Sequence, residues 1–235
     1  MPRPSCSLLA CVALAACGDS LTLPSQAMPG AVTVVRGDAQ VGTVGEPLAD
    51  SVVVRVLDLE DRPLAGQPVA FVPLPDDALA SPDTVLTDAA GRAAARWVLG
   101  TAAGEQRLEA RIESPVASGG LVATVTASAR AGPPEVFIEA GGQDQSAVPG
   151  TALPQPLVVR VEDRYGNPVE GTQVNWAVTR GGGFVSEPRT VTDAAGLTSV
   201  RWTLGVFGRR QTVEAALEAD PGRTVTFTAT ARPYP

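Results

Sequence analysis

The side chains that could carry out chemistry are few in kind. The chain of 235 residues has no histidine, and all 18 of its basic residues are arginine, so lysine is absent as well. A Ser-His-Asp triad, a Schiff-base lysine and a histidine-bound zinc ion are therefore excluded. The sequence also contains no G-x-S-x-G elbow and no phosphate-binding glycine loop. We expect no cofactor, and the chain is predicted not to be an enzyme.

Carboxylates remain as candidate acids, bases or calcium ligands. Asp76, Asp77 and Asp83 gather in one segment, and Asp58 and Asp61 gather in another. No pocket is evident around either group, so solvated acidic loops explain them more simply than catalysis does. The spacing of Asp58 and Asp61 does not fit the D-x-D-x-D-G pattern of a calcium loop, and neither does the sequence around Asp88. We assign no metal ligand, and a calcium site in the loops stays an open alternative.

Cysteines occur at positions 6, 11 and 17, all close to the N-terminus. They lie within and at the ends of a short apolar run that follows Arg3, and this arrangement is typical of a secretory signal. The run is shorter than the roughly 20 residues that a membrane-spanning helix needs. The chain after Cys17 has no further thiol, so no disulfide bond is expected within it.

The segment Leu14-Ala15-Ala16-Cys17 resembles the lipobox of bacterial lipoproteins. The resemblance implies cleavage of a signal peptide at residues 1–16 and acylation of Cys17, with 17–29 as a tether. Several acyl chains together anchor a protein stably in a membrane. An ordinary secretory peptide is the alternative. By the sorting rules of that family, Gly18 favours the outer membrane.

A long segment occurs twice, as "TDAAGRAAARWVLG" at 87–100 and as "TDAAGLTSVRWTLG" at 192–205. The same register continues through the surrounding sequence, which predicts two copies of one domain. We place domain one at 30–129, a linker at 130–133, domain two at 134–232 and a tail at 233–235. Pro133 and Pro134, where the linker meets domain two, favour an extended joint.

Within each copy, apolar and polar residues alternate with a period of two, which indicates strands that are buried on one face. The fold class is therefore all-β, and each "TDAAG" predicts a tight turn through Asp88 and Gly91 or through Asp193 and Gly196. The residues expected in the two cores are Trp97, Leu99, Trp202, Leu204, Phe71 and Trp176. The tryptophans could also suggest sugar stacking, but their phase on the strands places them inside.

The spaced motifs V-x-V-x-D, G-N-P-V-x-G, T-D-A-x-G and W-x-L-G resemble the bacterial immunoglobulin-like domains of the invasin and intimin type (group 1). Domain two carries all of them, from Val159 to Gly205. Domain one departs where Asp61 and Arg62 replace Gly166 and Asn167, which changes a turn. The resemblance implies two tandem Greek-key β-sandwiches of about 100 residues each. In that family such domains usually act as stalks.

The net charge of −7 argues against a nucleic-acid partner. Arg209 and Arg210 beside Phe207 could contact an anionic surface or a glycan, although a solvated hairpin tip explains them more simply. The segment 180–184, "RGGGF", is expected to be a flexible hairpin loop.

These observations favour a lipid-anchored envelope protein that serves as an adhesion or spacer module. It would contact the membrane through its N-terminal lipid and a protein or glycan through its domains. A periplasmic scaffolding subunit and an accessory fragment of a secreted hydrolase are the alternatives.

Overall fold

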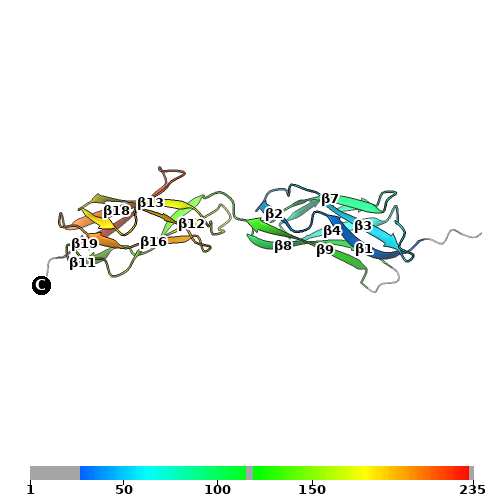
Figure 1. Ribbon diagram of the computed structural model, residues 1–235, viewed down its shortest axis with the longest axis horizontal. Helices are drawn as coiled ribbons and strands as arrows, with labels where there is room; N and C mark the ends of the chain where they lie inside the picture. The colour runs from blue at the N-terminus through cyan, green and yellow to red at the C-terminus, as the bar shows by residue number, and fades with distance from the viewer. Residues whose placement is uncertain (1–26, 115–118, 233–235) are drawn as a thin grey trace, which may run out of the picture.

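The computed structural model describes residues 27–114 and 119–232, and these residues form two β-sandwiches (Figure 1). The sandwiches lie end to end along the long axis of the molecule. No helix in the described part of the chain is long and apolar enough to span a membrane. The all-β fold class predicted from the alternating pattern is confirmed.

Domain one contains the first nine strands. Their bounds are β1 Pro29–Arg36, β2 Gln40–Thr43, β3 Val52–Asp58, β4 Pro68–Leu74, β5 Leu79–Ser81, β6 Thr84–Leu86, β7 Arg92–Val98, β8 Gly104–Ile112 and β9 Leu121–Arg130. One sheet has the order β1-β3-β7-β5 and the other the order β2-β9-β8-β4-β6. Strands β1 to β8 thus alternate between the two sheets, and β9 pairs with β8 in the same sheet, as in an immunoglobulin-like sandwich. The short strand β2 pairs parallel with β9, whereas the other pairs are antiparallel.

Domain two repeats this plan. Its strands are β10 Val136–Gly141, β11 Gln145–Ala147, β12 Leu157–Glu162, β13 Gln173–Arg180, β14 Gly183–Val185, β15 Arg189–Val191, β16 Leu197–Val200, β17 Trp202–Leu204, β18 Arg210–Leu217 and β19 Thr224–Ala231. The order β11-β19-β18-β13-β15 matches the larger sheet of domain one. The other sheet contains β10-β12-β16, and β17 pairs with β14. Strand β11 again pairs parallel with β19.

Each sandwich encloses its own apolar core. The alternating valines of β3 point inward, and Val52, Val54 and Val56 are fully buried. In domain two Leu157, Val159 and Val161 take the same places on β12. Large side chains fill the space that these branched residues leave between the sheets, which provides most of the stabilising burial.

The "TDAAG" turns form through local hydrogen bonds. In domain one the Asp88 carboxylate accepts the backbone N–H groups of Ala90 and Arg92 at 2.9 and 2.8 Å, and Gly91 has a φ of 72°. Asp193 and Gly196 form the same turn in domain two. A Cβ atom at Gly196 would lie 2.4 Å from the carbonyl oxygen of Val161, so only glycine fits this close approach.

Candidate functional site

The structure places the six predicted core residues inside the two sandwiches. The exposed fractions of these side chains lie between 0% and 3%, for Trp97, Leu99, Phe71, Trp202, Leu204 and Trp176. The Trp176 indole N–H donates to the Thr190 hydroxyl at 2.9 Å. Because all three tryptophans are buried, none of them presents a free ring face to a sugar. Cys17 lies outside the described residues.

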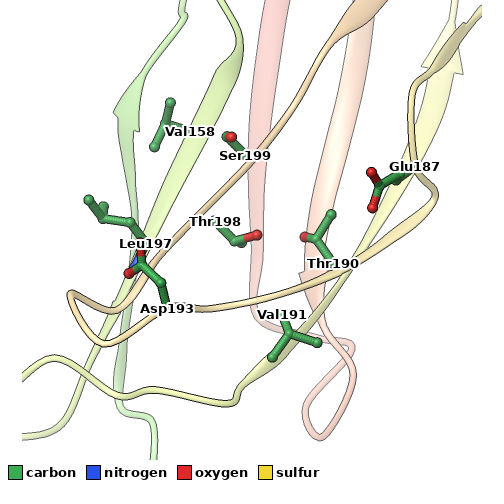
Figure 2. A pocket seen from close by; sticks show the side chains of 8 residues that line it. All are labelled: Val158, Glu187, Thr190, Val191, Asp193, Leu197, Thr198 and Ser199. Carbon is green, nitrogen blue, oxygen red and sulfur yellow. The ribbon is translucent and has the colours of Figure 1, made fainter.

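A surface hollow of about 510 Å³ lies on domain two between β12, β15 and β16 (Figure 2). Two of its polar groups already have structural partners. The Asp193 carboxylate holds its own turn, and the Thr190 hydroxyl accepts the Trp176 indole. The remaining carboxylate, that of Glu187, stands apart from Asp193 in Figure 2. The hollow therefore offers no pair of groups arranged for acid–base chemistry.

The acidic segments of domain one also serve local structure. The Asp77 carboxylate accepts the backbone N–H and the hydroxyl of Thr101, and these bonds lower its pKa. Asp58 holds the turn that follows β3. Among the residues described, no three acidic or cysteine side chains gather closely enough to hold a metal ion.

The side chains that join the two domains come from the turn after β12. The Asn167 amide donates to the Thr101 carbonyl at 2.8 Å, and its oxygen accepts the Ala103 N–H at 2.9 Å. Asn167 thus pairs with the loop between β7 and β8 of domain one much as a neighbouring strand would. Both the N–H and the oxygen of the Asn167 amide have a partner in domain one, so the two bonds fix the orientation of the side chain against this loop.

Asp163, which is fully buried, holds the linker against this turn. Its carboxylate accepts the N–H groups of Gly132, Tyr165 and Asn167 and the side-chain amide of Asn167, at 2.8–2.9 Å. Burial raises the pKa of Asp163, but these four bonds more than offset it and leave the pKa below 3.8. The linker is therefore bound to domain two by hydrogen bonds, and Pro133 and Pro134 restrict its backbone as well.

Tyr165 provides the second contact across the joint. A Cβ atom added at Gly45 would lie 2.6 Å from the Tyr165 hydroxyl oxygen, so the ring sits directly against this glycine. The Arg164 guanidinium stacks over the same ring, 4.5 Å from its centre. A small cavity of about 160 Å³ lies between the domains and is lined by Arg164, Tyr165 and Glu46 among others.

The equivalent turn of domain one closes on itself. The Asp58 carboxylate accepts the N–H groups of Glu60 and Arg62 at 3.0 and 2.8 Å and the Arg62 Nε at 2.9 Å. Burial raises the pKa of Asp58, but the bonds from Arg62 and Glu60 lower it overall. Asp61 adopts the left-handed conformation, with φ of 60°, that Gly166 adopts in domain two. Arg62 therefore occupies the place of Asn167 but satisfies only its own turn.

The end of domain two that faces away from domain one, here called the distal end, carries unusual side chains. Val206 and Phe207 are 69% and 74% exposed, and Phe184 is 63% exposed. Phe207 lies close to Gly182 in the predicted hairpin loop. Arg209 and Arg210 follow in the sequence, and both are exposed. By the internal repeat, this loop corresponds to the domain-one loop that Asn167 contacts.

Sequence reasoning noted Asn167 as part of a turn motif but missed its role in the joint. The signal was present, because domain one departs from the Gly-Asn pair at this very turn. Tyr165 and Gly45 could not have been paired from the sequence, since they lie in different domains and share no motif.

Comparison with known proteins supports the assignment for domain two. Residues 138–230 match the family described as bacterial Ig-like domain (group 1). No curated protein sequence matches the chain.

Several solved structures of bacterial surface proteins resemble the chain. The D0-D1 domain of intimin is 17% identical, with 86% of this chain and 95% of that one covered and a TM-score of 0.33. Invasin, described as a bacterial integrin-binding protein, is 23% identical, with 88% and 40% covered and a TM-score of 0.40. The Escherichia coli adhesin FdeC is 17% identical, with 88% and 65% covered and a TM-score of 0.49.

The chain thus spans less than two thirds of the invasin and FdeC chains that it resembles. The family match and the sandwich topology agree on domain two: residues 138–230 belong to the bacterial Ig-like domains of group 1.

Proposed function

We propose that the protein is a lipid-anchored, non-enzymatic component of the bacterial cell envelope. Its two Ig-like domains serve as a spacer that holds the distal end of domain two away from the membrane as an interaction module. Cys17 carries the lipid, and the outer membrane is the site of attachment.

The observation that carries this proposal is the joint between the domains. Asn167, Asp163 and Tyr165 hold the second sandwich on the end of the first, and not beside it. An end-to-end arrangement places β1, where the described part of the chain begins, and the distal end at opposite extremes of the two domains. Such an arrangement suits a spacer, because the anchor and the interacting surface are kept apart.

Protease treatment of intact cells tests this proposal. Cells producing the full chain are treated with a protease, and domain two is detected by immunoblotting beside a periplasmic control protein. Loss of domain two while the control survives is the expected result. If domain two is protected until the outer membrane is opened, the adhesion role is wrong and a scaffolding role inside the envelope takes its place.

A Cys17→Ser variant tests the anchor separately. The unaltered chain is expected in the membrane fraction, whereas the variant should be released into the soluble fraction, because it has no thiol to acylate at this position. Equal membrane association of both chains would contradict lipid attachment at Cys17.

A further inference from the structure

Three arginines surround one open hollow at the distal end of domain two. The hollow has a volume of about 430 Å³ and lies over the outer face of β18 and β19. It is lined by the polar residues Arg209, Arg210, Arg232, Thr228, Thr230 and Asp144, together with Ala229. Guanidinium groups and hydroxyls dominate this lining, so it presents hydrogen-bond donors to an incoming ligand.

None of the three arginines forms an ion pair within the described residues. Other arginines of the chain do, such as Arg107 with Glu105 at 2.9 Å and Arg111 with Glu109 at 2.8 Å. Asp144 is the one carboxylate that lines the hollow, and it accepts the hydroxyl of Thr228. The hollow therefore carries an excess of positive charge, although the net charge of the chain is −7.

The internal repeat shows that the fold does not require the charges of Arg209 and Arg210, whereas Arg232 corresponds to Arg130 of domain one. Arg209 and Arg210 correspond to Gly104 and Glu105 of domain one. The corresponding groove of domain one is lined by Gly104 and Arg130 and, from domain two, by the turn 168–171. This groove of domain one thus lies against domain two, whereas the three arginines around the hollow of domain two are exposed.

We propose that this hollow binds the sulfate or carboxylate groups of an acidic polysaccharide. Arginine forks bind such planar or tetrahedral anions through paired, charge-assisted hydrogen bonds. The neighbouring threonine hydroxyls suit the hydroxyl groups of a sugar. The polar lining favours a hydrated polymer over a lipid surface, because the exposed Val206 and Phe207 lie outside the hollow.

The proposal rests on the interaction role proposed above and names its partner class. Its test uses the purified full chain carrying Cys17→Ser, so that no acyl chain on Cys17 can insert into vesicles. Binding is measured at physiological ionic strength to four probes: heparin, polygalacturonate, polyglutamate and phosphatidylglycerol vesicles. Heparin carries sulfates and carboxylates, whereas polygalacturonate carries carboxylates alone, so the two polysaccharides separate these sources of negative charge.

We expect one or both polysaccharides to bind more tightly than polyglutamate or the vesicles. A triple variant, Arg209→Ala with Arg210→Ala and Arg232→Ala, should weaken this binding about tenfold or more. The matched control removes three exposed arginines of domain one, Arg36, Arg92 and Arg96, and should change the affinity by less than about twofold. Thermal unfolding checks that both variants remain folded.

Three results would overturn the proposal. They are the absence of polysaccharide binding, an equal loss of binding in the control variant, and tighter binding of polyglutamate or vesicles than of either polysaccharide. Because this measurement uses purified protein, it can fail while protease treatment still finds domain two outside the cell. Conversely, the purified protein can bind a polysaccharide while protease treatment leaves domain two intact, and this result would contradict only the surface location.

Discussion

The turn at 58–62 and the turn at 163–167 hold the same buried aspartate in two different ways. In domain one, Arg62 folds back and satisfies Asp58 within its own turn. In domain two, Asn167 bonds Asp163 and also reaches across to Thr101 and Ala103. The shared aspartate keeps the fold of each copy, while the residue four positions later adapts the turn to its neighbour.

The difference teaches where a repeated domain can diverge without loss of stability. Trp97 and Trp202 are the same residue at one buried position of the two cores, where a change of volume would leave a cavity or a clash. The turn residues differ because one copy faces another domain and the other copy does not contact one within the described residues. The loop 101–103 of domain one and the corresponding loop 206–208 of domain two differ for the same reason.

The largest expected effect comes from the cores, where the two copies should behave alike. Trp97→Ala and Trp202→Ala should each lower the free energy of unfolding of their own domain by about 3–5 kcal/mol, because each leaves a large cavity. Chemical denaturation followed by circular dichroism should show one early transition and one unchanged transition in each variant. Loss of both transitions together would show that the domains unfold as a single unit.

Removing the aspartate of the joint should have the next largest effect. Asp163→Ala leaves three backbone N–H groups without their acceptor, which should cost domain two about 2–3 kcal/mol. It should also free the linker at Gly132. Hydrogen exchange measures both effects, since the Gly132 amide should lose its protection. Asp58→Ala is the matched control, and it should leave Gly132 protected.

A smaller change in stability should follow from breaking the contact between the domains alone. Asn167→Ala should cost domain two only about 1 kcal/mol but broaden the range of distances between the two domains. Pulsed dipolar spectroscopy with one spin label on each domain measures this range. Arg62→Ala serves as the control, because its side chain bonds only within its own turn. An unchanged distribution for Asn167→Ala would mean that Asp163 and Tyr165 suffice to hold the joint.

The smallest expected effect is the loss of stability at acidic pH. The pKa values of Asp58 and Asp163 are lowered, so their stabilising bonds are complete above the ordinary value of 3.8 and are lost as the pH falls below it. Thermal unfolding should therefore show both domains weakening in this acidic range. Asp163→Asn should reduce the acid dependence of the second domain only, and equal dependence in both domains of that variant would contradict the assignment.

The sequence alone determined the architecture within each domain. Period-two alternation and the repeated "TDAAG…W-x-L-G" segment were enough to predict two all-β sandwiches, because burial of one strand face and the need for glycine at positive φ are local requirements. The inward direction of the valines of β3 followed from the same alternation.

Only the tertiary structure decided what lies at the ends of the domains. It brings Asn167 against the loop 101–103 and the ring of Tyr165 against Gly45. It also brings Arg232 beside Arg209 and Arg210. Each of these contacts joins segments that are distant in the sequence. No periodicity encodes such contacts, because they depend on how two folded bodies meet and on which strands a sandwich brings side by side.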